Sequence, residues 1–469
     1  MTGSTVTHIN MISSVALASI VLHSTLQTRV YGVRAIPFLV SWTVLLLPLL
    51  LSMTLFANKP AILSFLLLIP PGLILLRTSA PESAIIPPPS SARSAASMTP
   101  TTSRFPTEVK PGSLKPLPAI TTYRAHMMLM TVLGILAVDF PVFPRTLAKC
   151  ESYGVSLMDL GVGSFVFSNG VVSAIPLLKD PAHLNAPLLP KVTTVVRKTL
   201  PIIALGVVRV LLVKGTDYPE HETEYGVHWN FFISLALLPV LQVLLHPLIR
   251  VVPASLLGIG VGILQQLALS VFGLKDYVRT APRLNLISAN KEGIASLGGY
   301  LSIHLLGLSI GTLILPPSPN FFRRLRVRRS TPAELGAPRQ KRQRRDRAGE
   351  LCNGVANLPY ALWIAAFNTS YILGYLVLDM VFFPAPYVPK KAKPAPASVS
   401  PSTTAPLLEA INKNALPLFL LANILTGLVN LSMQTMYAGP AASMGVLSFY
   451  ALVVSGVAWR LRETRVWRL

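Results

Sequence analysis

Long runs of apolar residues alternate with short polar segments along most of the chain. A run of about 20 mostly apolar residues is long enough to cross a bilayer as an α-helix. The pattern predicts an all-α fold, a polytopic integral membrane helical bundle with about 13 transmembrane helices. The predicted spans are residues 9–27, 36–57, 60–77, 125–143, 157–177, 199–214, 229–248, 253–273, 295–315, 353–368, 371–385, 414–431 and 441–459. The pair at 353–385 shares one apolar run, with a hinge expected at Asn368 to Ser370.

Positive charge is distributed unevenly between the two sides of the predicted bundle. An odd number of spans places the two termini on opposite sides, and Lys and Arg gather in the cytosolic segments of membrane proteins. If the amino terminus lies outside, the inner segments hold 32 Lys and Arg residues and the outer segments hold eight. The distribution therefore predicts a lumenal N-terminus and a cytosolic C-terminus.

The overall composition agrees with a membrane protein, because 52% of the residues are hydrophobic and only 13% are charged. The formal net charge of +23 would point to nucleic acid in a soluble protein. Here the orientation of the spans accounts for the charge, so we expect no nucleic acid partner. The two cysteines, Cys150 and Cys352, are too few for a disulfide framework or a four-cysteine zinc site.

Three inner segments differ from the spans in composition. Residues 78–120 are rich in Pro, Ser and Thr, residues 318–350 are rich in Arg, and residues 387–408 are rich in Pro. Such segments lack the apolar side chains needed to form a core. We expect them to be disordered cytosolic loops within a single multi-span membrane domain, residues 1–469.

The first polar cluster follows the fourth predicted span. Asp139 lies at the end of the span, and Pro141 and Pro144 follow it and interrupt the helix, so Asp139 and Lys149 are free to meet across a turn. A carboxylate beside an amine at a water-poor interface is either an interfacial salt bridge or a proton-transfer pair, and the residues alone leave both open. Arg145 joins this cluster as a candidate substrate-binding residue.

Asp159 lies at membrane depth in the next predicted span, near glycines that allow close helix packing. Ionisable residues within a span are costly, so it is a second candidate substrate-binding residue.

The loop from Lys214 to Phe232 combines four carboxylates with His221 and His228. Two histidines among carboxylates fit either a metal site or a general base, and we assign them as possible general bases with no metal ligand set. Asn230, just before the next apolar run, is included as a candidate substrate-binding residue.

A third loop, residues 275–300, places cations on the side that the positive-inside rule disfavours. Binding of an anionic ligand would explain them, and so would pairing with nearby carboxylates. The sequence does not separate these two explanations. The candidate substrate-binding residues in this loop are Arg279, Arg283, Asn290, Lys291 and Glu292.

Several familiar catalytic motifs are absent from the sequence, including the P-loop, the G-x-S-x-G elbow and the H-E-x-x-H zinc motif. Two N-x-S/T sequons, at Asn368 and Asn430, fall on predicted outer ends of spans. Both lie so close to the membrane that the sequence does not decide whether they carry glycans.

Five longer strings are similar to motifs of the inositol acyltransferase family of glycosylphosphatidylinositol (GPI) anchor synthesis, in particular its fungal members. The strings are VDFPVFP, YGVSLMDLGVGSFVFSNG, EYGVHWNFFISLALLP, SANKEGIASLGGYLSIHLLG and ANILTGLVNLSMQTM. The resemblance runs from about Tyr123 to Tyr437, broken by the variable inner loops, and the family's usual 13 spans agree with the count above.

The resemblance implies a multi-pass endoplasmic reticulum membrane enzyme that transfers a fatty acyl group, typically palmitoyl, from acyl-CoA to the inositol 2-hydroxyl of glucosaminyl-phosphatidylinositol. It implies acyl-CoA as a co-substrate and no bound cofactor, and its catalytic aspartate and lysine correspond to Asp139 and Lys149. Two positions depart from the family pattern: Thr146 replaces a common basic residue, and Lys291 replaces an arginine. A lysine offers a point charge where arginine offers a two-pronged contact to phosphate.

Two other classes of protein share some of these features. A secondary transporter also needs many spans, but its polar residues gather near the membrane midplane, whereas here they gather at one end of the predicted spans. A lipid carrier would bind the same lipids without covalent chemistry. An assay for acylated lipid separates the enzyme from both alternatives.

Overall fold

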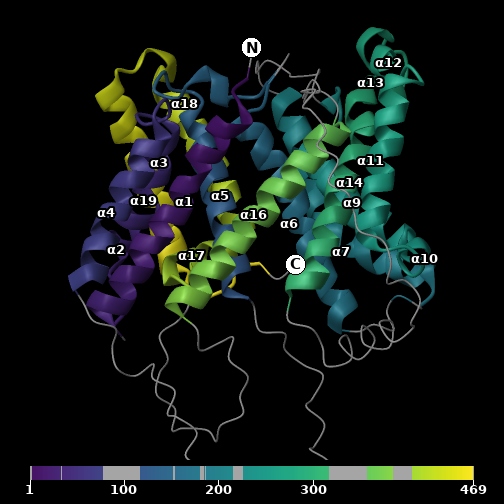
Figure 1. Ribbon diagram of the computed structural model, residues 1–469. Coiled ribbons are helices and arrows are strands. Elements are labelled where there is room, and N and C mark those ends of the chain that lie inside the picture. The colour runs from purple at the N-terminus through teal and green to yellow at the C-terminus, as the bar shows by residue number, and fades with distance from the viewer. Residues whose placement is uncertain are drawn as a thin grey trace, which may run out of the picture.

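The computed structural model describes residues 3–32, 34–77, 117–150, 154–179, 184, 186–214, 225–315, 356–383 and 404–467. In this part of the chain the regular structure is helical, apart from one isolated bridge between Ser4 and Val155. The helices form one bundle (Figure 1). The protein is thus an all-α polytopic membrane protein, as the apolar pattern predicts.

The helices follow the apolar runs closely. In chain order they are α1 (Val6–Leu26), η1 (Gln27–Tyr31), α2 (Phe38–Leu45), α3 (Leu47–Met53), α4 (Pro60–Arg77), α5 (Pro118–Ala137), η3 (Arg145–Leu147), α6 (Leu157–Lys179), α7 (Leu188–Lys214), α9 (Phe231–Leu244), α10 (His246–Ile249), α11 (Ala254–Ser270), α12 (Leu274–Thr280), α13 (Leu286–Ala289), α14 (Lys291–Ile314), α16 (Leu358–Phe382), α17 (Pro406–Lys413), α18 (Ala415–Ser432), η6 (Thr435–Tyr437) and α19 (Pro440–Arg460).

Fewer helices than 13 are long and apolar enough to cross a membrane alone. The described residues contain eight such helices, or nine if α11 and α12, which meet at a 58° bend, form one span. The predicted span 36–57 is divided into α2 and α3 next to Pro48, which lacks a backbone N–H. α9 has only 14 residues, and α7 carries several Lys and Arg residues. The expected 13 spans and the orientation of the termini are therefore not confirmed, and the predicted spans 353–368 and 371–385 correspond to the single helix α16.

The expected hinge between residues 353–368 and 371–385 is wrong. A single helix of 25 residues, α16, runs through it without a break. The segment at the supposed hinge contains neither Pro nor Gly, so nothing in the backbone ends the helix there. The fully buried side chain of Asn368 donates to the carbonyl oxygen of Ile364 at 2.7 Å and accepts from the Tyr123 hydroxyl at 2.6 Å, so its polar groups are satisfied inside the bundle.

Most of the expected disordered loops lie outside the described residues, namely 78–116, 318–350 and 387–403. The last residues of two of these segments are helical, because α5 begins at Pro118 and α17 begins at Pro406. Proline is well tolerated in the first turn of a helix, where its missing N–H has no partner to lose.

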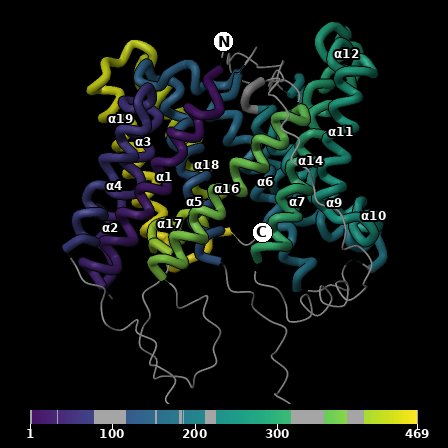
Figure 2. Tube along the Cα trace, viewed as in Figure 1, coloured from purple at the N-terminus to yellow at the C-terminus, as the bar shows by residue number. Residues whose placement is uncertain are grey.

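The bundle has two groups of helices, with α16 running diagonally across the front between them (Figures 1 and 2). Helices α1 to α4 lie with α17 to α19 in one group, and α9 to α14 lie in the other. α6 and α14 pack very closely: a Cβ atom on Gly170 would lie 2.1 Å from the His304 carbonyl oxygen, and one on Gly307 would lie 2.3 Å from that of Phe167. Glycine allows this approach of two backbones, which brings the first turns of α6 and α14 to the same end of the bundle.

Candidate functional site

The candidate side chains gather at the end of the bundle where α6, α9 and α14 begin and where α5 and α18 end. This is the upper end in Figure 1, close to the amino terminus. The sequence pattern predicts that these residues form separate loop clusters. In the structure, the contacts described below join them into one region. We call it the upper end from here on.

Asp139 lies in the turn that follows α5, where the prolines end the helix as expected. Its carboxylate accepts a hydrogen bond from the Asn430 side-chain amide at 2.9 Å. Burial raises the pKa of the Asp139 carboxyl, while the Asn430 hydrogen bond and the nearby charge of Arg145 act in the opposite direction. A carboxyl whose pKa is raised in this way is a stronger base than an exposed aspartate.

Arg145 is held beside Asp139 by the turn itself. Its guanidinium donates to the carbonyl oxygen of Val138 at 2.8 Å and contacts the sulfur of Met436 at 3.0 Å. Arg145 thus links the turn after α5 to the segment that follows α18, and it places a fixed positive charge near the Asp139 carboxylate.

Lys149 lies in a second group of side chains at the upper end. Its ammonium is 5.4 Å from the centre of the Tyr225 ring, within the range of a cation–π interaction. Lys149 is also a charged neighbour of Asp159, whose carboxylate accepts the backbone N–H of Cys150 at 3.4 Å. The hydroxyl of Tyr360 donates to the backbone carbonyl of Asp159 at 2.8 Å, which connects α16 to the first turn of α6.

The sequence pattern predicts that Asp139 and Lys149 are free to meet across a turn. Both residues lie at the upper end, but within the described part of the chain the polar neighbours of Asp139 are Asn430 and Arg145, and those of Lys149 include Tyr225 and Asp159. The upper end therefore contains two acid and cation groups, Asp139 with Arg145 and Asp159 with Lys149.

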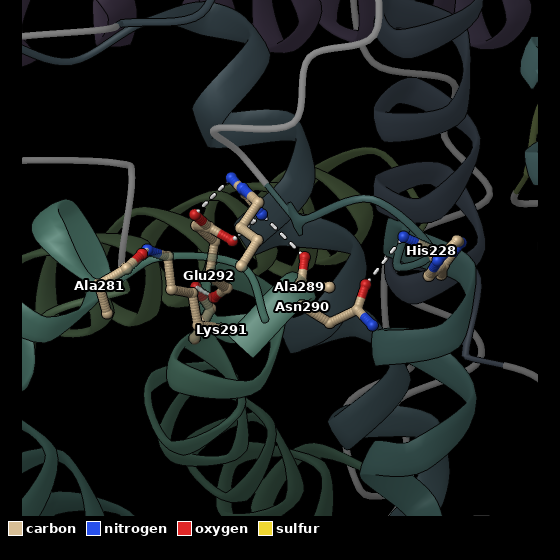
Figure 3. A network of polar contacts seen from close by, with 8 residues as sticks. His228, Ala281, Ala289, Asn290, Lys291 and Glu292 are labelled. Atoms are coloured by element: carbon tan, nitrogen blue, oxygen red, sulfur yellow. Dashed lines mark hydrogen bonds and ion pairs between the residues drawn. The ribbon is translucent and has the colours of Figure 1, made fainter. Parts of the chain in front are cut away.

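Arg283 and Glu292 form an ion pair at the start of α14, with 2.8 Å between Nη2 and Oε1 (Figure 3). The Glu292 side chain is only 7% exposed. Arg283 also donates to the carbonyl oxygen of Ala289 at 2.8 Å, and the Lys291 ammonium donates to the carbonyl oxygen of Ala281. Of the two explanations for the cations in this loop, pairing with a carboxylate applies to Arg283, whereas Lys291 is held by a backbone carbonyl.

Asn290 connects the start of α14 to the segment that precedes α9 (Figure 3). Its side-chain oxygen accepts the backbone N–H of His228 at 2.8 Å, and the backbone N–H of Val227 donates to Ala289 at 3.0 Å. Gly226 has a φ of +101°, and a Cβ there would lie 2.6 Å from the Ala289 carbonyl oxygen, so only glycine fits this contact. These contacts hold residues 225–230 against α14 and so place Tyr225 beside Lys149.

The remaining candidates divide into structural and exposed residues. Asn230 is the N-cap of α9, accepting the N–H groups of Phe232 and Ile233, and its amide donates to Gly206 at 2.7 Å. The side chain of His228 is exposed, as is Arg279 on α12. His221 and the acidic part of its loop lie outside the described residues.

Sequence reasoning missed two partners in the site. The sequence marks Asn430 only as a sequon, although its amide contacts Asp139, and it marks Tyr225 only as one residue of the acidic loop. Neither residue carries a signal that identifies it without the fold. The other sequon, at Asn368, lies buried in the middle of α16, so the expectation that it falls at the end of a span is wrong.

Comparison with known proteins identifies a family whose sequences match this chain. The GWT1 family model matches residues 1–461. A GPI-anchored wall transfer protein 1 from Cryptococcus neoformans var. grubii is 46% identical over 391 residues, which cover 75% of this chain and 63% of that protein. Proteins of the same name from Gibberella zeae and Aspergillus fumigatus are each 38% identical, and the matches cover 98% and 99% of this chain and 94% and 96% of those proteins.

The match thus extends over less than two thirds of the Cryptococcus protein, but over nearly the whole length of the other two. The family model spans almost the whole chain, including every helix that contributes to the upper end. The chain therefore belongs to the GWT1 family.

Proposed function

We propose that this protein is a membrane O-acyltransferase of GPI-anchor biosynthesis in the endoplasmic reticulum. It would transfer a fatty acyl group, typically palmitoyl, from acyl-CoA to the inositol 2-hydroxyl of glucosaminyl-phosphatidylinositol. The observation that supports this most strongly is a half-buried carboxyl, Asp139, beside fixed positive charge at the upper end of the bundle, in a chain of the GWT1 family.

In the proposed reaction, the inositol hydroxyl attacks the thioester carbonyl carbon of acyl-CoA while Asp139 accepts the hydroxyl proton. A C–O bond forms, the C–S bond breaks, and the coenzyme A thiolate leaves and takes up the proton that Asp139 accepted, which restores the carboxylate. An unactivated hydroxyl is a poor nucleophile, and a positioned general base accelerates such a step by about 10² to 10⁴. Burial, which raises the Asp139 pKa, makes this carboxylate suited to the role.

Lys149 has two possible roles, as a proton relay for Asp139 or as a cation that stabilises the oxyanion of the tetrahedral intermediate. Its position supports the second role, because the Tyr225 ring face and the Asp159 carboxylate both attract a cation and so hold the side chain in place. The exposed Arg279 remains a candidate for a phosphate group of either substrate, and the exposed His228 a candidate for a second base.

The test is an assay with purified protein, labelled acyl-CoA and glucosaminyl-phosphatidylinositol, in which mass spectrometry detects the acylated lipid. We expect Asp139→Asn and Lys149→Ala to form no product while they elute as folded protein in detergent. Asp276→Asn, which changes an exposed aspartate on α12, is the matched control and should retain activity. Full activity of Asp139→Asn would remove the proposed base.

The same assay decides between the enzyme and a carrier or transporter. If the wild-type protein binds the lipid but never yields an acylated product with any acyl-CoA, the protein moves lipid without covalent chemistry. The acylated product in the wild-type reaction, together with its loss in Asp139→Asn, would exclude that alternative.

A further inference from the structure

A separate hollow lies between the first turns of α1 and α4. Its volume is 410 Å³, within the ~300–1,000 Å³ typical of small-molecule sites. It is lined by Thr5, Thr7, His8, Met11, Asn58, Lys59, Pro60, Ala61 and Ile62. None of these residues belongs to the two acid and cation groups described above, although Ser4, next to Thr5, pairs with Val155 just before α6.

The walls of the hollow are held by specific contacts. The His8 ring bonds to the carbonyl oxygen of Ala57 through Nε2, at 2.6 Å, and to the Ser4 hydroxyl through Nδ1. These bonds attach the start of α1 to the turn before α4. Further along the two helices, the hydroxyls of Ser14 and Ser64 lie 3.3 Å apart and join α1 to α4. The opening is therefore bordered by a fixed part of the fold.

The rim of the hollow is polar and positively charged. Lys59 contributes an exposed ammonium, Thr7 an exposed hydroxyl and Asn58 an exposed amide. The described lining contains neither Asp nor Glu. Lys59 directly precedes α4, an 18-residue helix whose amino-terminal dipole end adds partial positive charge at the same place, although Pro60 has no N–H and the Ile62 N–H donates to the Lys59 carbonyl. These groups together favour an anion with several oxygen atoms.

The other side of the hollow is apolar and continues along the exposed apolar surface of α4. Met11 and Ile62, which line the hollow, are 42% and 47% exposed. Below them the side chains of Phe65, Ile69 and Leu73, spaced four residues apart on one face of α4, are 69%, 54% and 55% exposed. A polar rim followed by an apolar ridge matches a ligand with an anionic head and a long chain.

We propose that this hollow binds an anionic glycerophospholipid of the surrounding bilayer. The lipid phosphate contacts the Lys59 ammonium, the headgroup hydrogen-bonds to Thr7 and Asn58, and one acyl chain lies along Phe65, Ile69 and Leu73. The binding involves no covalent step and does not depend on the acyltransferase proposal.

Native mass spectrometry of the full-length protein in detergent tests the site, with phosphatidylserine and phosphatidylcholine of identical acyl chains as probes. We expect phosphatidylserine to bind more tightly than phosphatidylcholine. Lys59→Glu, which reverses the charge, and Thr7→Trp, which fills the hollow, should each weaken phosphatidylserine binding roughly tenfold or more. Lys275→Glu, an exposed lysine at the same end on α12, is the matched control and should bind as the wild type does.

Three results would overturn the proposal. The first is equal affinity for the two lipids. The second is phosphatidylserine binding by Lys59→Glu that is as tight as binding by the wild type. This result is sufficient by itself if Thr7→Trp does not fold. The third is full competition by glycerophosphoserine at equal concentration, since a headgroup without acyl chains should not replace a lipid that also uses the α4 ridge.

Discussion

The side-chain amide of Asn430, at the end of α18, donates a hydrogen bond of 2.9 Å to the carboxylate of Asp139, in the turn after α5. The two residues are 291 positions apart in the chain, so only the packed bundle brings them together. A hydrogen bond to a carboxylate stabilises the ionised form, and the nearby Arg145 does the same. Asn430 is therefore positioned to tune the proposed base without touching the reacting atoms.

Replacing Asn430 by Ala should raise the Asp139 pKa further, because the hydrogen bond that favours the carboxylate is lost. The base must be ionised to act, so the acidic limb of the profile of kcat/KM against pH should move to higher pH. At a pH on that limb, the rate should fall roughly fivefold, as expected for one hydrogen bond worth ~1 kcal/mol. The rate on the alkaline side of the limb should change little.

Asn423→Ala is the matched control for this experiment. Asn423 lies on the same helix, is exposed and bonds to the carbonyl oxygen of Phe419 within that helix. An identical pH profile for Asn430→Ala and the wild type would show that the hydrogen bond does not influence the catalytic ionisation.

The ring of Tyr225 should be needed for the position of the Lys149 ammonium, 5.4 Å away. Tyr225→Leu removes the π face and should lower kcat about 3- to 30-fold, corresponding to the ~0.5–2 kcal/mol of a cation–π contact. Tyr225→Phe keeps the face and should stay close to the wild type. If Phe and Leu at this position lose the same activity, the tyrosine hydroxyl and not the ring is the important group.

The ion pair between Arg283 and Glu292 should contribute to stability. Arg283→Met leaves the nearly buried Glu292 carboxylate without its partner, which should cost about 1–3 kcal/mol and lower the melting temperature in detergent. Arg283→Met combined with Glu292→Leu should recover most of that loss. KM for the lipid substrate should not change in folded protein.

The opposite result for stability and KM would support the sequence-based prediction that Arg283 binds the substrate. An unchanged melting temperature together with a clearly raised lipid KM would mean that Arg283 binds the substrate phosphate.

Asn368 should carry no glycan, although it lies in an N-x-S/T sequon, because its side chain is fully buried in α16. Glycosidase treatment should give the same electrophoretic shift, or none, for the wild type and Asn368→Gln. Asn368→Ala should also destabilise the protein by about 1–3 kcal/mol, because the buried Tyr123 hydroxyl loses its nearer acceptor and keeps only the Ser164 carbonyl oxygen at 3.5 Å. A glycan that disappears in Asn368→Gln would contradict the burial.

The lengths and positions of most helices could be predicted from the chain because apolar content is a local property. The predicted span 60–77 coincides with α4, and the prolines after Asp139 end α5 as expected. The predicted hinge in α16 is wrong because it depends on a contact with another helix, which is not a local property. A polar residue within an apolar run is tolerated when another helix satisfies it, and Tyr123, which satisfies Asn368, is 245 residues away.

The candidate site was also predicted only in part. The sequence placed Asp139, Lys149 and Asp159 at one end of the bundle, since each lies at or near the end of an apolar run. It did not identify Asn430 and Tyr225 as their neighbours. It also left open whether Arg283 and Lys291 serve a ligand or the protein itself, because one-dimensional spacing does not show which groups are close in space.

The sequence by itself determined that the chain folds as membrane helices, because burying long apolar runs in lipid is favourable whatever their neighbours are. The tertiary structure decided which polar side chains meet at the upper end, which of them are satisfied by other parts of the protein, and which carboxyl has its pKa raised by burial. These properties depend on distances between distant segments, and the close packing of helices such as α6 and α14 sets those distances.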